Sequence, residues 1–427
     1  MVEQQPASDS GGWLSGPRPV WQASLTSTLR SHVTGPAPTT TDIPVPTPSA
    51  APPCGVLPSQ GLWRAVQEGW ISSGDYRIRP EHIQPASIDL RLAHTAWALR
   101  CSFLPTARTP VMDRVHDLAI DQIDLRDGAT LERDRPYLIP LLEELALPAH
   151  VRAKANPKSS TGRLDVFTRV ITDHNHRFDE IAPGYRGRLY LEVVPRSFAV
   201  RVEPLLSLNQ LRLVSGDPRV SDRELARIHH ESPLLYVDDR ALPTSELAIA
   251  DGLFLSVDLS GPHNRVVGYR AKRNSNRLDM ARHAHYRWRD YWEPVHPEPG
   301  HRIVLDPEVF YLLLSSEGVC VPPRYAAEMM AYDPTAGELR THYAGFFDPG
   351  FGYDPHGRQR GSRAALEVRA RDVPFMVEHR QPISKLAFER MLEVPDKLYG
   401  AQAGSNYQGQ RTTLSKHFTE PAGSRAA

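Results

Sequence analysis

Cysteine is scarce in this sequence. The 427 residues include three cysteines, Cys54, Cys101 and Cys320, which are widely separated and form no Cys-x-x-Cys pair. A disulfide framework is therefore not expected, and each thiol should behave as a small apolar side chain. This cysteine usage suits a reducing compartment, and we expect a cytoplasmic protein.

An excess of charge and a long apolar run are also missing. Lysine plus arginine and aspartate plus glutamate number 50 each, so the formal net charge is zero. Without surplus positive charge there is no general attraction to nucleic acid or to a membrane surface, and we expect neither as a partner. No apolar stretch approaches the roughly 20 residues of a membrane span, and the N-terminus does not read as a signal peptide. Any binding of anions should therefore be local.

The composition changes along the chain. Residues 1–52 are rich in Pro, Ser, Thr and Gly and offer too little apolar surface to offset the entropy of ordering, so we expect a disordered tail. From Leu57 on, short alternating segments such as Ile83–Leu92 and Tyr137–Pro140 are separated by Pro, Gly and Asp turns. Many short strands with few helical patterns predict a mainly β protein, a barrel or a sandwich.

Segments of the first half recur in the second half in the same order. The pairs are 85–91 with 252–260, 145–151 with 319–325, 181–185 with 347–351, and 190–193 with 365–368. Each likeness is weak alone, but their common order predicts two copies of one β-rich domain. The expected parts are a first copy over 53–216, a connector over 217–245, a second copy over 246–398, and a C-terminal lid and tail over 399–427.

A polar turn in the first copy carries the chemistry. It reads Lys158-Ser159-Ser160-Thr161-Gly162-Arg163, with two hydroxyls, a glycine and a cation at each end. These are groups that can grip a polyphosphate. A Pro-Gly turn then leads into the alternating strand Leu189–Val193, which places Glu192 on the polar face. An anion cradle and an isolated carboxylate predict a site that binds a nucleotide's phosphates and performs proton transfer at its far end.

The second copy differs at these positions. It has no paired serines and no arginine over 330–335, but it keeps a glutamate, Glu367, at the position that corresponds to Glu192. It is followed by the polar segment Tyr399–Gln410, which could fold over a ligand as a lid. An ordinary frayed terminus is the alternative reading of that segment.

As a set, these motifs resemble the dCTP deaminase family of the dUTPase-like superfamily, in its long form with a tandem duplication. The family's opening strand is similar to residues 84–92, and its phosphate motif, Arg-Ser-Ser-x-x-Arg, is similar to residues 158–163 with lysine in the first place. Its Pro-Gly-aromatic hairpin leads to a catalytic glutamate, which falls on Glu192. The matches extend from about Leu57 to Phe418. The resemblance implies two tandem dUTPase-like distorted β-barrels, of β-clip or jelly-roll type, with few short helices.

The resemblance also implies an activity, the hydrolytic deamination of dCTP to dUTP and ammonia. The sequence has no His-x-Glu and Pro-Cys-x-x-Cys cluster of the kind that zinc deaminases use, so no zinc is expected. Glu192 would exchange protons with the attacking water, which Ser159 would help to hold, and Glu367 is the reserve candidate. The residues implied to bind the nucleotide are Lys158, Ser159, Ser160, Arg163, Tyr190, Leu191, Asp348, Tyr399, Tyr407 and Gln410. Mg²⁺ is expected on the triphosphate, with no protein ligand.

Assembly decides which glutamate acts. The family works as a ring of three barrels with sites between neighbours, so the resemblance implies a homo-oligomer, a trimer or larger. If first copies form the ring with first copies, Glu192 is the base. If the phosphate turn of one copy instead faces the hairpin of the other, Glu367 and Asp348 contact the substrate.

Two other functions fit the same motifs. A dUTP diphosphatase, or a bifunctional dCTP deaminase and dUTPase, would share the cradle but would need a carboxylate near the α-phosphate. A non-catalytic nucleotide-binding regulatory module would bind dCTP without turnover.

Overall fold

The computed structural model describes residues 53–330, 339–341, 345–354, 356–400, 403, 405, 407–410 and 413–419. The tail expected over 1–52, and residues 331–335 of the segment that replaces the cradle in the second copy, lie outside the described residues.

Strands predominate, which confirms the mainly β class. Those of the first half are β1 (Gly55–Val56), β2 (Ile71–Ser72), β3 (Ile88–Arg91), β4 (Thr95–Leu99), β5 (Ala119–Asp124), β6 (Ala129–Leu131), β7 (Tyr137–Ala146), β8 (Val151–Pro157), β9 (Val166–Thr172), β10 (Glu180–Ile181), β11 (Arg186–Pro195), β12 (Val200–Val202) and β13 (Ser207–Ser215). Those of the second half are β14 (Leu235–Val237), β15 (Arg240–Ala241), β16 (Leu253–Ser256), β17 (Gly268–Ala271), β18 (Leu278–Asp279), β19 (Tyr286–Arg287), β20 (Trp292–Val295), β21 (Arg302–Leu305), β22 (Phe310–Val319), β23 (Tyr325–Met330), β24 (Leu339–Thr341), β25 (Phe346–Phe347), β26 (Ser362–Ala370), β27 (Phe375–Glu378), β28 (Pro382–Arg390) and β29 (Phe418–Thr419). The helices are α1 (Ser59–Gln67), α2 (Val111–Leu118), α3 (Ser159–Gly162) and α4 (Asp222–Glu231), with 3-10 turns η1 (Pro80–His82), η2 (Thr244–Glu246) and η3 (Trp288–Asp290).

The strand pairings of the first half recur in the second half. In the first half β3 pairs with β13, β13 with β8 and β8 with β10; in the second half β16 pairs with β28, β28 with β23 and β23 with β25. Likewise, β11 on β7 corresponds to β26 on β22. The registers place Glu192 opposite Leu138 and Glu367 opposite Leu312. The two glutamates are therefore equivalent positions of a duplicated fold.

Residues 217–245 do not form the connector that the sequence analysis expects. Helix α4 begins after the N-cap Ser221 and buries Leu225 and Ile228 in the second core. Strand β14 then pairs with β22, as β2 pairs with β7 in the first copy. The charged residues of this segment lie on the exposed face of an amphipathic helix, so a charge count alone hides its buried face. The second copy thus begins near residue 220.

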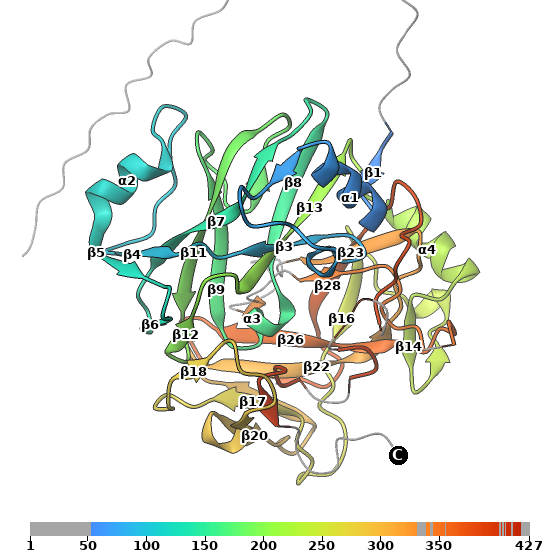
Figure 1. The fold of residues 1–427 in the computed structure, drawn as a ribbon. Coiled ribbons are helices and arrows are strands. Elements are labelled where there is room, and N and C mark those ends of the chain that lie inside the picture. The colour runs from blue at the N-terminus through green and yellow to red at the C-terminus, as the bar shows by residue number, and fades with distance from the viewer. Residues whose placement is uncertain are drawn as a thin grey trace, which may run out of the picture. The chain divides into compact units, whose positions relative to one another are not determined.

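The two copies share apolar packing. The first core cluster also contains Trp292, Phe310 and Phe418 from the second half of the chain, and Phe198 meets Trp292 edge to face with ring centroids 5.3 Å apart. Each fully buried side chain of this size contributes about 1.5–3 kcal/mol. Strand β12 also pairs in parallel with β18. This shared packing sets α3 of the first copy over β26 of the second (Figure 1).

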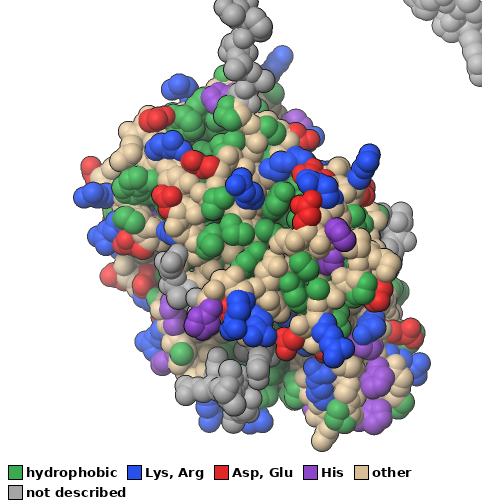
Figure 2. Space-filling view, turned by 90° about the vertical axis from the view of Figure 1, so that its right-hand side faces the viewer, with side chains coloured by type: hydrophobic (Ala, Val, Ile, Leu, Met, Phe, Trp, Pro, Cys, Tyr) green, Lys and Arg blue, Asp and Glu red, His purple; other side chains and the backbone are tan. Residues whose placement is uncertain are grey.

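The surface carries charges of both signs. On the side where α4 and β14 lie, Lys and Arg side chains alternate with Asp and Glu in small groups, between apolar side chains (Figure 2). This mixture agrees with the zero net charge of the sequence. Among the described residues, no helix is both long enough and apolar enough to cross a membrane.

Candidate active site

The phosphate turn predicted from the sequence forms a short helix at the end of β8. Pro157 closes the strand, Lys158 caps α3 with an extended backbone, and the amides of Thr161 and Gly162 donate to the carbonyl of Lys158 at 2.8 and 3.0 Å. The C-terminal segment supports this turn from behind, because Ser415 Oγ donates to the Ser160 carbonyl at 3.0 Å. Hydrogen bonds to the backbone carbonyls of Lys158 and Ser160 therefore hold the turn on both sides.

Arg163 is the cation that the turn presents to the cavity. Its side chain is almost fully buried, with the guanidinium 3.7 Å from the centroid of the Tyr407 ring. Nη1 donates to the Thr413 carbonyl at 3.4 Å, and Nε is buried without a hydrogen-bond partner among the described residues. A buried guanidinium that no carboxylate in the described chain neutralises at close range is suited to bind an anionic ligand.

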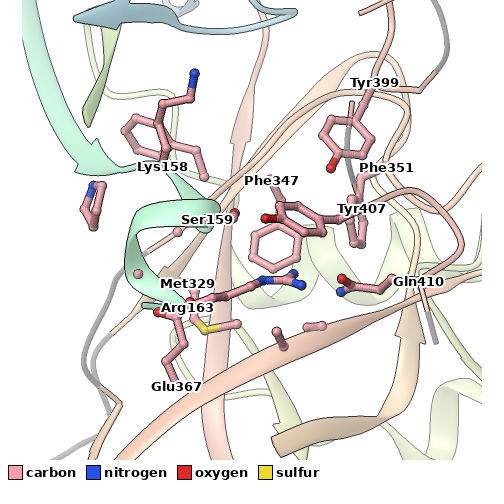
Figure 3. Close-up of a pocket in the computed structure, with 16 residues that line it drawn as sticks. Lys158, Ser159, Arg163, Met329, Phe347, Phe351, Glu367, Tyr399, Tyr407 and Gln410 are labelled. Atoms are coloured by element: carbon pink, nitrogen blue, oxygen red, sulfur yellow. The ribbon is translucent and has the colours of Figure 1, made fainter. Parts of the chain in front are cut away.

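Glu367 lies directly against this turn. A Cβ atom added to Gly162 would lie 2.6 Å from Oε2 and 2.9 Å from Oε1 of Glu367, so the close approach of the carboxyl group requires glycine there. Burial raises the pKa of Glu367 to about 8, and the nearby Asp165 adds to the rise while Arg163 opposes it. Figure 3 shows the acid below the turn, with the Arg163 guanidinium extending from the turn toward Gln410. Cradle and acid thus meet within one chain.

Aromatic side chains of the second copy and of the lid form the rest of the wall. They are Phe346, Phe347, Phe351, Tyr399 and Tyr407, with Met329 and Gln410 beside them. The Tyr399 ring lies 5.3 Å from Phe351, and Gln410 Nε2 donates to the Arg363 carbonyl at 2.7 Å. The cavity has a volume of about 60 Å³, against roughly 300–1,000 Å³ for typical ligand sites. Side chains of the segment that the sequence predicts as a lid therefore fill much of the space.

Asp348 belongs to a buried network rather than to the cavity lining. It accepts a hydrogen bond from Arg212 Nη2 at 3.1 Å, and burial raises the pKa of its carboxyl group. Arg212, on β13 of the first copy, also donates to the carbonyls of Ala327 and Phe347 at 3.0 Å each and stacks 4.0 Å from the centroid of the Phe346 ring. One arginine of the first copy therefore holds the wall that the second copy contributes.

Glu192 does not reach the phosphate turn, which corrects the first choice of catalytic residue. Its side chain is fully buried and paired with Arg169, whose Nε donates to it at 3.0 Å. The Arg169 guanidinium is in turn stacked 3.7 Å from the centroid of the Phe178 ring. An internal arginine thus neutralises this acid, and Glu192 is absent from the residues that line the cavity.

The two residues before Glu192 are core residues, a second correction. Tyr190 packs with Leu138 and Ile171 beneath α2, and Leu191 lies in the first core. Neither lines the cavity, whereas Ala365, the equivalent of Tyr190 in the second copy, does.

The remaining predicted residues divide into two groups. Ser159, Arg163, Tyr399, Tyr407 and Gln410 all line the cavity, and so does Lys158. The Lys158 ammonium, however, is bound by Asp89 at 2.5 Å and points away from Glu367 (Figure 3). Ser160 is buried behind the turn and is not part of the lining.

Sequence reasoning missed three contributors. Asp89 positions Lys158, Arg212 positions the aromatic wall, and Gln408 accepts from the Gly352 amide at 3.3 Å, which ties the lid to the second copy's hairpin. The sequence contained a signal for Asp89, because this residue lies in the segment 84–92 that resembles the family's opening strand. Arg212 and Gln408 have no local signal, since their roles depend on which segments meet in space.

Comparison with known families agrees with this geometry. The model described as the N-terminal domain of 2'-deoxycytidine 5'-triphosphate deaminase matches residues 53–217, and the model of the C-terminal domain matches residues 221–418. The chain belongs to the dCTP deaminase family. It is thus a member of an enzyme family, and the recognition of a duplicated family member is confirmed.

A solved member of the family has a similar structure. The crystal structure of 2'-deoxycytidine 5'-triphosphate deaminase from Agrobacterium tumefaciens is 42% identical, with a TM-score of 0.74, and the match covers 79% of this chain and 99% of that one. This likeness confirms the predicted dUTPase-like β fold.

Shorter relatives match about a third of the chain. "dCTP deaminase, dUMP-forming" of Corynebacterium glutamicum is 28% identical over 147 residues, which is 34% of this chain and 74% of the relative. The protein of the same description from Methanothermobacter thermautotrophicus is 26% identical over 143 residues, 32% of this chain and 67% of the relative.

Proposed function

We propose that this protein hydrolyses dCTP to dUTP and ammonia at the cavity between its two copies, with Glu367 as the group that transfers protons. The observation that carries the proposal is the pairing of Arg163, a buried cation without an ion-pair partner in the described chain, with a carboxyl group of raised pKa across one cavity. The triphosphate would bind at Arg163, and the pyrimidine ring would lie at Glu367.

The phosphate end depends on the first copy. Arg163 would bind phosphate oxygens through its guanidinium, held in place by stacking on Tyr407. Ser159 would donate its hydroxyl, and Lys158 would add positive charge from its place beside Asp89. Charge-assisted hydrogen bonds to an anion contribute about 1.5–3 kcal/mol each, so these few groups suffice for a selective anchor.

The chemical end depends on Glu367. As water adds to C4 of the ring, one of its protons passes to the Glu367 carboxylate and from there to ring N3. The proton of the new C4 hydroxyl then passes through the same carboxyl group to the amino group, which leaves as ammonia, and C4 becomes a carbonyl carbon. The water-poor site makes Glu367 a stronger base than a solvated glutamate. A carboxyl group placed in this way contributes roughly 10²–10⁴-fold.

Mg²⁺ would arrive with the nucleotide. Among the residues that the structure describes, no group of three or more His, Cys, Asp or Glu side chains could hold a metal ion, whereas the cradle supplies phosphate-binding groups. The proposal therefore assigns the ion to the triphosphate oxygens, where it would offset part of their negative charge. No zinc takes part in the proposed steps.

A bifunctional reaction that ends at dUMP is the second candidate, because the relatives from Corynebacterium glutamicum and Methanothermobacter thermautotrophicus are described as dUMP-forming. The same assay separates the possibilities. Ammonia release with dCTP, CTP and dUTP should be greatest with dCTP, and pyrophosphate should stay absent if dUTP is the final product. Equal yields of ammonia and pyrophosphate would establish the bifunctional reaction. Binding of dCTP without ammonia release would instead indicate a regulatory module.

Assembly into a homo-oligomer, a trimer or larger, remains a prediction. The close approach of the cradle and Glu367 inside one chain supports the arrangement in which the phosphate turn of one copy faces the hairpin of the other, rather than sites formed between first copies. Light scattering of the full chain measures the assembly state.

A further inference from the structure

A second cavity shares the lid residue Gln410 with the candidate active site. It has a volume of about 330 Å³, and its lining includes Asp258, Arg265, Arg363, Gln410 and Thr413. Gln410 lines both cavities, and the carbonyl of Thr413 accepts a hydrogen bond from Arg163 of the cradle. The second cavity is therefore linked to the phosphate turn through two residues of the C-terminal segment.

The charge of this cavity is positive. Asp258 Oδ2 binds Arg265 Nη2 and Arg363 Nη1 at 2.8 Å each. Arg265 is further fixed by the carbonyl and hydroxyl of Ser260, at 2.7 and 2.8 Å. Two guanidinium groups share one carboxylate, so these three residues together carry one unit of excess positive charge. Arg363 has no second carboxylate partner among the described residues, and its Nε and Nη2 groups are left to donate to a ligand.

Two polar atoms of the lining lack partners. Thr413 Oγ1 and Gln410 Oε1 are buried and form no hydrogen bond within the described residues. Thr413 is only 2% exposed. A buried polar atom without a partner costs about 1–3 kcal/mol, and native proteins retain few of them unless a ligand or water completes the site. The hydroxyl of Thr413 can donate to an anion oxygen, whereas Gln410 can turn its amide to present N–H groups.

The first copy uses an aspartate near its opening strand for a related purpose. The two aspartates are not equivalent in the strand pairing, because the registers align Asp89 with Phe254 and Asp258 lies two residues beyond the end of β16. Asp89 holds Lys158 at the phosphate turn. Each copy therefore has an aspartate near its opening strand that orients cations at the edge of a cavity.

We propose that this cavity binds a phosphate-class anion, which Arg363 and Arg265 recognise and which the lid contacts through Gln410 and Thr413. The anion is either the terminal phosphate of the bound nucleoside triphosphate or a separate inorganic anion. The first source rests on the proposed function. The second does not, because binding of inorganic pyrophosphate can be measured whether or not the protein deaminates dCTP.

The test uses the full-length protein and substitutions of single arginines. Arg363→Met keeps the apolar stem and leaves Asp258 paired with Arg265, so the fold should persist. Arg270→Met is the matched control, because Arg270 forms exposed ion pairs with Glu293 and Asp306 outside this cavity. Arg163→Met removes the guanidinium of the cradle and isolates the second cavity. Calorimetric titration with inorganic pyrophosphate, and binding of dCTP and dCDP at constant ionic strength, provide the readouts.

If the anion is separate, Arg163→Met should still bind pyrophosphate, and the double variant Arg163→Met/Arg363→Met should lose at least tenfold in that affinity. If it is the terminal phosphate, Arg363→Met should reduce the preference for dCTP over dCDP about tenfold, which corresponds to about 1.4 kcal/mol. Arg270→Met should change neither value. The proposal would be overturned if Arg363→Met left both the affinity for pyrophosphate and the ratio of the affinities for dCTP and dCDP unchanged. Ammonia release, measured separately, reports on the proposed function.

Discussion

The two copies have the same strand pairings, but they differ in the polar side chains that they contribute to the site. The first copy presents a phosphate cradle but pairs its own acid, Glu192, with Arg169. The second copy leaves its acid, Glu367, without an arginine partner at hydrogen-bond distance among the described residues, and lays it against the cradle of the first. Equivalent positions in a duplicated fold therefore need not keep equivalent roles. The nearest cation decides which glutamate is left unpaired beside the cradle, and we propose that this one transfers protons.

The largest effect on activity is expected from substitution of Glu367, with Glu192 as the comparison. Glu367→Gln should lower kcat for ammonia release by roughly 10²–10⁴-fold, because it removes the proton acceptor. The matched double variant Glu192→Gln/Arg169→Met removes the equivalent acid together with its partner and should retain activity within a few-fold. Full activity in Glu367→Gln would contradict the assignment.

The contact between the copies can be weakened at Arg212. Arg212→Met leaves Asp348 buried without its cation, and removal of one partner of a buried ion pair typically costs about 3–5 kcal/mol. The free energy of unfolding from urea titration should fall by that order. Arg188→Met, which breaks the exposed pair with Glu144, is the control and should cost less than about 1 kcal/mol. Similar values for the two variants would argue against a structural role for Arg212.

The contribution of the first copy is tested at Arg163. Arg163→Met should lower kcat/KM for dCTP by about 10–100-fold, as expected for the loss of one charge-assisted contact. Arg163→Lys should recover only part of this, because an ammonium group cannot reproduce bidentate binding or planar stacking. If lysine restores full activity, charge alone is sufficient and the stacking on Tyr407 is not needed.

The raised pKa of Glu367 gives a pH dependence. The base must be deprotonated, so kcat/KM should rise about tenfold per pH unit up to about pH 8 and then level off. The same group binds its proton more tightly when folded than when unfolded, so its stabilising contribution is complete below about pH 4.5 and is lost as the pH rises through about 8. The Tm of Glu367→Gln relative to wild type should therefore be more favourable at pH 8 than at pH 5. A flat rate profile between pH 6 and 8 would count against Glu367.

The smallest effect is expected at Gly162. Gly162→Ala places a Cβ atom 2.6 Å from the Glu367 carboxyl group, closer than real Cβ contacts, so the carboxyl group must move away and kcat should fall several-fold with little change in stability. Gly128→Ala is not a suitable control because its φ of +72° is strained for alanine. Gly61 in α1, which does not line the cavity and has no positive φ, serves instead. Loss of stability rather than of kcat in Gly162→Ala would indicate a packing role only.

Much of this molecule could be predicted from local sequence. The duplication is confirmed by the two family models, and Ser159, Arg163, Tyr399, Tyr407 and Gln410, which the motifs indicate, all line one cavity. These features depend on residues close together in the chain or on repeats in a fixed order. A local pattern is sufficient to identify them.

The choice between Glu192 and Glu367 could not be predicted in this way. Both lie on equivalent strands, and nothing in the strand itself reveals which one faces the cradle. The decision comes from tertiary contacts, in which Arg169 pairs with the first and Gly162 makes room for the second. The buried face of α4 was missed for a related reason, because its charged residues outnumber the apolar ones that reach the core.

The apolar packing shared by the two copies has a consequence for how the protein behaves at low concentration. Trp292, Phe310 and Phe418 bind the second copy to the first within a single polypeptide. The two halves of the site therefore cannot separate when the protein is diluted, and turnover per chain should stay constant down to concentrations at which a site built between subunits would dissociate.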